Sequence, residues 1–310
     1  MIDTFSQALP HGITLSCRSA GARGRPVLMF LHGFPEGAFV WDPLLEYFAD
    51  PAHGGYYCVA PNLRGFDASS SPAEPTAYRA KHLVQDIAAL IAASTSSPDD
   101  TAHAGKLTCL IAHDWGGAVA WNLANQMPES LDRLAIVNSP HPATFLRELT
   151  HNPRQQAASA YMNFLIRPDA ERLLAEEDFR RLWSFLTKTK DGVKSADWLT
   201  DDLRTRYRAL WRQGLTGGCN YYRASPLRPA HGDDAGAAKI KLPPGMLTVD
   251  VPTLVVWGMQ DIALLPELTD GLEDYVPKLT LHKVADASHW IVHEQPQHVI
   301  DLIARFLNET

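Results

Sequence analysis

The sequence of 310 residues is poor in cysteine and has no cluster of positive charge. Its four cysteines are scattered and form no CxxC pair, so we expect reduced, buried thiols in a reducing, cytoplasmic compartment. Lysine and arginine number 28 against 35 aspartates and glutamates, a net charge of −7. Without a basic run, neither nucleic acid nor an anionic membrane surface is an expected partner. The first ten residues do not resemble a signal peptide, and no apolar run is long enough to span a membrane.

Short apolar runs typical of buried strands alternate with helical patterns through most of the chain. The predicted strands are 12–20, 26–31, 56–60, 107–112, 131–138, 252–257 and 279–284, and the clearest predicted helices are 81–93, 118–126 and 296–307. From Ala143 to about Gly218 the patterns are helical only. We therefore predict an α/β fold, a mostly parallel sheet flanked by helices, with an inserted helical cap domain. The expected division is 1–139 for the first part of the core, 140–245 for the cap and 246–310 for the second part.

One aspartate, Asp114, stands between a predicted buried strand and a predicted helix. Small residues flank it, Ala112 before and Gly116 after, and only such residues allow a sharp turn that exposes residue 114 at the carboxyl end of the sheet. This is the pattern of a nucleophile elbow with Asp in place of serine. A carboxylate is charged at neutral pH and needs no base to act as a nucleophile, which suits displacement at a saturated carbon. The alternative is that Asp114 only caps the following helix.

The ester that such a nucleophile forms must be hydrolysed by an activated water, which calls for a histidine supported by a carboxylate. His289 lies just past the last predicted strand, and Asp261 lies just past the strand before it. The carboxyl ends of parallel strands meet at one edge of a sheet, so both should lie near Asp114. Asp286 is a weaker rival for the acid, because it is close in sequence to the base.

Hydrolysis of the ester also creates an oxyanion, which backbone N–H groups should bind. Trp115, directly after the nucleophile, is expected to supply one and Phe34, in the turn His32 to Pro35, the other. That turn is also a candidate for a cis proline at Pro35. An epoxide oxygen leaves as an alkoxide and needs hydroxyl donors such as tyrosine, whereas a halide needs N–H donors.

Taken together, these motifs resemble the α/β-hydrolase-fold epoxide hydrolases over nearly the whole chain. The motifs are His113 to Gly117, His32 to Glu36, Asp261 and Ser288 to Trp290, and the order of nucleophile, acid and base agrees. The resemblance implies that two cap tyrosines bind the epoxide oxygen, Tyr161 and the Tyr222 of Asn220 to Arg223, with Tyr221 as a packing neighbour. Asn62 and Asp169 depart from the usual family residues, in a structural loop and a cap turn.

The expected activity is conversion of an epoxide to a vicinal diol through a covalent aspartyl ester, with water as co-substrate and no metal or organic cofactor. Haloalkane or haloacid dehalogenases, which share the aspartate nucleophile, are the nearest alternative. A serine-type esterase is excluded by Asp114, and a non-catalytic small-molecule sensor would be expected to lack part of the triad or the cap donors. The sequence leaves open whether the protein is a monomer or a homodimer, and which epoxide it takes.

Overall fold

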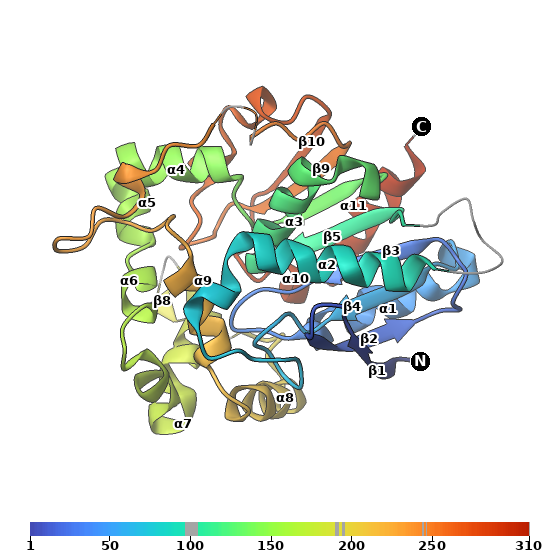
Figure 1. Cartoon of the computed structure of the whole chain (residues 1–310), viewed down its shortest axis with the longest axis horizontal. Coiled ribbons are helices and arrows are strands. Elements are labelled where there is room, and N and C mark those ends of the chain that lie inside the picture. The colour runs from blue at the N-terminus through green and yellow to red at the C-terminus, as the bar shows by residue number, and fades with distance from the viewer. Residues whose placement is uncertain (97–104, 190–191, 194–195, 244, 246, 310) are drawn as a thin grey trace.

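The computed structural model describes residues 1–96, 105–189, 192–193, 196–243, 245 and 247–309. At its centre is an eight-stranded sheet with the spatial order β1-β2-β4-β3-β5-β6-β9-β10 (Figure 1). The strands are β1 Asp3–Ala8, β2 Thr14–Ala20, β3 Val27–Leu31, β4 Tyr57–Pro61, β5 Cys109–His113, β6 Leu134–Val137, β9 Thr253–Gly258 and β10 Leu279–Val284. From β4 to β10 all neighbours are parallel, while β1 and β2 form an antiparallel edge. The predicted fold class is confirmed.

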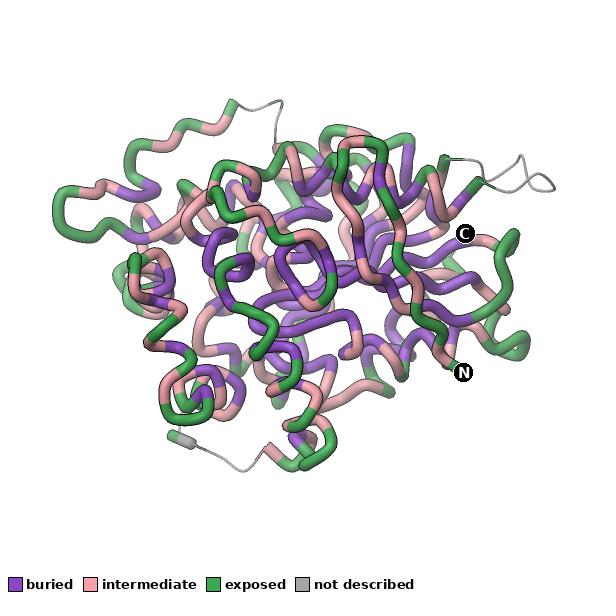
Figure 2. Tube along the Cα trace, turned by 60° about the horizontal axis from the view of Figure 1, so that its bottom comes forward, coloured by how far each residue is buried: buried purple, intermediate pink, exposed green. Residues whose placement is uncertain are grey.

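Helices cover both faces of the sheet, because its strands are apolar on both sides. In β3, Leu28 and Phe30 pack with α1 (Asp42–Ala49) and α11 (Pro296–Asn308), whereas Met29 and Leu31 pack on the other face, with α2 and α3. These last helices span Ala80–Thr95 and Trp115–Gln126. Figure 2 shows the sheet as the buried centre of the molecule. Continuous apolar strands between two helical layers are what a parallel sheet requires.

Between β6 and β9 the chain leaves the sheet and forms a succession of helices beside its carboxyl edge (Figure 1). They are α4 Pro142–His151, α5 Pro153–Ala158, α6 Tyr161–Leu165, α7 Ala170–Thr187, α8 Asp201–Arg212 and α9 Thr216–Ala224. The expectation that this part has no strands is wrong in one detail, since β7 (Lys188–Thr189) and β8 (Gly192–Val193) form a short antiparallel pair. Two-residue strands held by backbone hydrogen bonds leave no alternation to detect.

Strand β1 is a second element that the sequence patterns did not indicate. Its sequence, DTFSQA, is mostly polar and largely exposed, because β1 lies at the edge of the sheet and pairs only with β2. Helix α3 also begins three residues earlier than predicted, directly after Asp114. Most of the predicted loop between α2 and β5 lies outside the described residues.

Candidate active site

The turn from β5 into α3 holds Asp114 in a strained backbone conformation. Its φ and ψ are 49° and −121°, a region that non-glycine residues enter at a cost of about 1 to 3 kcal/mol. Close packing makes the turn possible: a Cβ on Gly116 would lie 2.4 Å from the carbonyl oxygen of Leu31, and one on Gly33 would lie 2.3 Å from the Cβ of Asp114. The side chain of Asp114 makes no capping hydrogen bond to α3. Its Oδ1 instead accepts a 2.8 Å hydrogen bond from the amide of Phe34.

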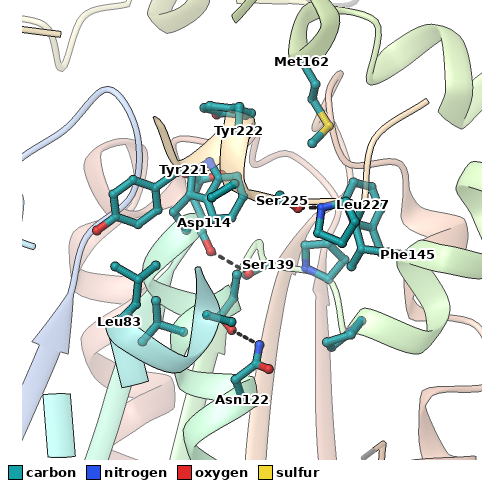
Figure 3. A pocket seen from close by; sticks show the side chains of 18 of the residues that line it. Leu83, Asp114, Asn122, Ser139, Phe145, Met162, Tyr221, Tyr222, Ser225 and Leu227 are labelled. Atoms are coloured by element: carbon teal, nitrogen blue, oxygen red, sulfur yellow. Dashed lines mark hydrogen bonds between the residues drawn. The ribbon is translucent and has the colours of Figure 1, made fainter. Parts of the chain in front are cut away.

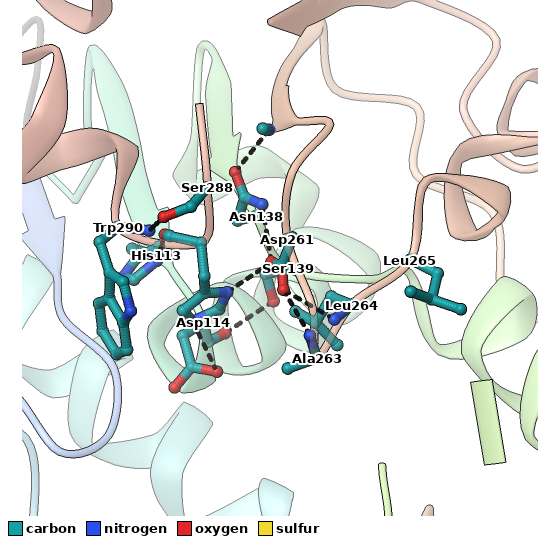
Figure 4. A network of polar contacts seen from close by, with 12 residues as sticks. His113, Asp114, Asn138, Ser139, Asp261, Ala263, Leu264, Leu265, Ser288 and Trp290 are labelled. Carbon is teal, nitrogen blue, oxygen red and sulfur yellow. Dashed lines mark hydrogen bonds and ion pairs between the residues drawn. The ribbon is translucent and has the colours of Figure 1, made fainter. Parts of the chain in front are cut away.

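Strand ends bring His289 and Asp261 to the same edge, as the sequence predicted. Figure 4 shows Asp114 and Asp261 within the polar network at this edge. The Nδ1 of His289 lies 2.6 Å from Oδ2 of Asp261, and its Nε2 lies 3.7 Å from Oδ2 of Asp114. Asp261 is completely buried, whereas the rival Asp286 is exposed. The three predicted triad residues therefore form one array, with the imidazole between two carboxylates.

Asn138 and Ser139, the two residues that directly follow β6, support this array. The sequence patterns did not point to either of them. Asn138 donates from Nδ2 to Oδ2 of Asp261 at 2.9 Å, and its Oδ1 accepts from the amide of Gly258 at 2.9 Å. Ser139 donates from Oγ to the carbonyl oxygen of Asp114 at 2.7 Å. The sequence signal that could have pointed to both residues is their position directly after a strand, at the edge of the sheet that carries Asp114.

The other carboxylate oxygen of Asp261 also accepts hydrogen bonds, so both of its oxygens have donors. Oδ1 of Asp261 accepts from the amides of Ala263 and Leu264 at 2.8 and 2.9 Å. Burial alone would raise the pKa of Asp261, but the charge and hydrogen bond of His289, with the Leu264 and Asn138 bonds, lower it below its usual value. Asp261 is thus an ionised partner of His289, held by hydrogen bonds on both of its oxygens.

Burial alone would lower the pKa of His289, but the opposing carboxylates outweigh it. The charge and hydrogen bond of Asp261, followed by the charge of Asp114, raise the pKa to about 9. In the free protein the imidazole is therefore protonated at neutral pH. Loss of the Asp114 charge would bring that pKa down.

The two cap tyrosines named by the resemblance come together above Asp114. Tyr161 is on α6 and Tyr222 on α9, with ring centroids 6.0 Å apart in an edge-to-face arrangement. Burial, together with the nearby Asp114 charge, raises the pKa of both phenols, so both hydroxyls keep their protons. Tyr221 points elsewhere, since its hydroxyl donates to the carbonyl oxygen of Arg64 at 3.0 Å.

Two cavities meet at Asp114, Tyr161 and Tyr222. The first, of about 290 Å³, lies between α2 and α3 on one side and the helices after β6 on the other, and is lined mainly by apolar side chains such as Phe145 and Leu227 (Figure 3). The second, of about 380 Å³, is more polar; its walls include Gln260, Ser288, His289 and Asp261. Asp114 thus stands at a junction, with His289 on the side of the second cavity.

Within the described part of the chain, no group of three or more His, Cys, Asp or Glu side chains is arranged to hold a metal ion. The four cysteines are all buried and unpaired. Among the described residues no helix is both long and apolar enough to cross a membrane. The Phe34–Pro35 peptide bond is cis, in the turn where the sequence made it a candidate.

Comparison with known proteins identifies the family of this chain. A family model described as alpha/beta hydrolase fold matches residues 26–296. The chain belongs to the α/β-hydrolase family. This α/β hydrolase is 35% identical over 300 residues to the AB hydrolase superfamily protein YfhM of Bacillus subtilis (strain 168), covering 96% of this chain and 95% of the relative. It is 31% identical over 309 residues to epoxide hydrolase 4 of Mus musculus, covering 96% and 77%.

Among solved structures, an epoxide hydrolase of Bacillus megaterium in complex with an inhibitor superposes on this α/β hydrolase with a TM-score of 0.85. The identity is 30%, and the match covers 98% of this chain and all of the other. The resemblance to epoxide hydrolases predicted from the motifs is therefore confirmed at the level of sequence and fold.

Proposed function

We propose that the protein is an epoxide hydrolase that converts an epoxide to a vicinal diol through an ester on Asp114. The observation that carries this proposal is the convergence of a carboxylate and two protonated tyrosine hydroxyls on one cavity junction. A carboxylate can attack an epoxide carbon, and two hydroxyl donors can stabilise the oxygen that this attack releases. Relatives named epoxide hydrolase support the same reaction.

In the first step, Oδ2 of Asp114 attacks an epoxide carbon, because Oδ1 is held by the Phe34 amide. The carbon–oxygen bond breaks, and its electron pair goes to the oxygen, which receives hydrogen bonds from Tyr161 and Tyr222. This oxygen then takes a proton through a tyrosine hydroxyl, balanced by the proton that the His289 imidazolium gives up. The product is a hydroxyalkyl ester. Asp114 is now uncharged, and His289 loses one of the two carboxylates that raise its pKa.

In the second step, His289 takes a proton from a water in the more polar cavity while Asp261 holds its other ring nitrogen. The hydroxide attacks the ester carbonyl carbon, and the charge develops on Oδ1, where the Phe34 amide already donates; Trp115 is the proposed second amide donor. Collapse of this intermediate releases the diol and restores the carboxylate. The cap boundaries 140–245 and the roles of these site residues are part of the proposal.

The two cavities support a substrate class. The apolar cavity fits an aryl or alkyl substituent, and the cavity beside His289 must admit water. We therefore propose epoxides with one large apolar group.

The test is formation of diol from styrene oxide by the wild type, Tyr222→Phe and Tyr221→Phe, with halide release from 1-bromobutane measured in parallel. We expect diol formation to fall at least about tenfold in Tyr222→Phe, and to persist largely in Tyr221→Phe, whose hydroxyl is bonded to Arg64. Halide release without diol would instead favour the dehalogenase reaction. An ester adduct on intact His289→Gln protein, seen by mass spectrometry, tests the covalent step.

A further inference from the structure

Asn122 is a polar side chain in the wall of the apolar cavity, two turns along α3 from Trp115. An α-helix rises about 1.5 Å per residue, so about 10 Å along the helix axis separates Asn122 from Trp115. Figure 3 shows Asn122 on the side of Asp114 that faces away from Tyr222. Its neighbours one turn earlier, Ala118 and Val119, also line the cavity and are apolar. Asn122 therefore places a polar group in an apolar stretch of wall, at a distance from the reacting atoms.

The hydrogen bond of Asn122 fixes which end of its amide faces the cavity. The nitrogen Nδ2 donates to the backbone carbonyl oxygen of Ala118 at 2.8 Å (Figure 3). A carbonyl oxygen can only accept, so the amide atom beside Ala118 must be the nitrogen. The amide oxygen, Oδ1, is then the end that points away from this bond.

This Oδ1 is an acceptor that is open to the cavity. Among the described residues, four buried side-chain atoms have no hydrogen-bond partner, namely Trp41 Nε1, Asn163 Oδ1, Trp257 Nε1 and Glu267 Oε2. Oδ1 of Asn122 is not one of these sealed atoms, although no described residue donates to it. A ligand in the cavity can therefore reach it.

The other polar side chains of this wall, apart from those of the proposed reaction, are engaged with the backbone. Tyr78, Tyr221 and Ser139 donate to the carbonyl oxygens of Pro72, Arg64 and Asp114, and Ser225 accepts from the amide of Leu227. Among the described lining residues, Asn122 thus differs from these hydroxyls in offering an amide oxygen that has no donor.

Such an acceptor discriminates between substituents of the same size. A wholly apolar group that covers Oδ1 excludes water from it and leaves the acceptor without a partner, which is costly. A group with an O–H or N–H donor at the same place replaces the hydrogen bond of the water. Sites that bind a donor of the substrate therefore reject the analogue that lacks it.

We propose that Asn122 is a specificity-determining residue, and that its Oδ1 accepts a hydrogen bond from a hydroxyl or N–H group at the far end of the large substituent of the epoxide. This inference rests on the proposed function and narrows its substrate class to epoxides whose large apolar group ends in a hydrogen-bond donor. The apolar wall binds the body of that group, and Asn122 binds its end.

The functional test compares 4-hydroxyphenyl glycidyl ether with 4-methylphenyl glycidyl ether, which have the same length and differ in one donor. For each epoxide, kcat/KM of diol formation is measured with the wild type and with Asn122→Leu, whose side chain has a similar size and no acceptor. We expect the ratio of kcat/KM, hydroxyl over methyl, to fall at least about fivefold in Asn122→Leu. The ratio is independent of the fraction of folded enzyme, and an unchanged ratio would overturn the proposal.

Asn125→Leu is the matched control. Asn125 lies on the same helix but lines neither cavity, and its Nδ2 donates to the carbonyl oxygens of Gly245 and Thr248. The ratio of the two epoxides should therefore stay at its wild-type value. An equal fall in Asn125→Leu and Asn122→Leu would show that the ratio does not depend on Oδ1 of Asn122, and would also overturn the proposal.

Calorimetry with two unreactive ligands, 4-propylphenol and 4-propyltoluene, separates the acceptor from the reaction. We expect Asn122→Leu to lose at least about fivefold in affinity for 4-propylphenol and not for 4-propyltoluene. Equal changes for the two ligands, or no binding of either to the wild type, would contradict the role of Asn122. A wild type that shows the expected binding and forms no diol from either epoxide would instead contradict the proposed function alone.

Discussion

Nε2 of His289 faces Oδ2 of Asp114 at 3.7 Å, across a gap longer than a hydrogen bond. The two side chains are close enough for their charges to interact, and the gap leaves the carboxylate oxygen free to attack. The proposed base therefore depends on the proposed nucleophile for its protonation state. Once Asp114 is an ester, the imidazole loses this partner and becomes available to accept a proton.

A first prediction concerns this dependence. NMR titration of His289 should give a pKa of about 9 in the wild type and a lower one in Asp114→Asn, because the substitution removes one of the charges that raise it. Asn conserves the shape of the side chain, so the comparison isolates the charge. Equal pKa values in the two proteins would contradict the proposed coupling.

Stability should depend on pH through the same histidine. The pKa of His289 is about 9 in the folded protein against about 6.5 for a histidine in the unfolded chain, so its contribution is complete below about pH 6.5 and is lost as pH rises through 9. The size of the contribution is about 3 kcal/mol. Urea unfolding at pH 6 and pH 9.5 should show the wild type losing this much more stability than His289→Gln. If the wild type and His289→Gln differed in stability by the same amount at both pH values, the raised pKa of His289 would be refuted.

Replacing Gly33 tests the packing around Asp114, the proposed nucleophile. A Cβ there would lie 2.4 Å from Oδ1 of Asp114, so Gly33→Ala should displace the carboxylate and lower kcat/KM about a hundredfold. Gly245→Ala is the control, since a Cβ at that position meets nothing within 4 Å. The measurement is the rate of diol formation by both variants. Near-normal activity of Gly33→Ala would contradict the close packing of Gly33 against Asp114.

Asn138 should matter for both stability and rate. Its replacement by Ala leaves Oδ2 of Asp261 with one donor fewer and the Gly258 amide without its acceptor, at a cost of about 1 to 3 kcal/mol. A looser Asp261 should also lower kcat more than it changes KM. Asn125→Ala, which removes an exposed hydrogen bond to Thr248, should have little effect on either. Thermal unfolding and steady-state kinetics would separate the two contributions.

The sequence predicted the parallel core and the meeting of Asp114, Asp261 and His289 because their signals are local. A nucleophile elbow needs small residues at fixed neighbouring positions, and strand ends place Asp261 and His289 at the edge that carries Asp114. The hydrogen bonds that other residues make around these three side chains were not predictable in the same way. Asn138 and Asp261 are 123 residues apart, so only the folded chain shows that they touch. The edge strand β1 was missed because an exposed strand needs no apolar face.

In the proposed mechanism, the junction at Asp114 also sets the order in which epoxide and water can use the site. An ester whose bulky group fills the apolar cavity leaves the chamber beside His289 open to water. An epoxide with large groups on both carbons would fill both chambers, form the ester and then exclude the water needed to cleave it. Such a compound should give one rapid turnover followed by arrest, and so act as a suicide inhibitor that labels Asp114.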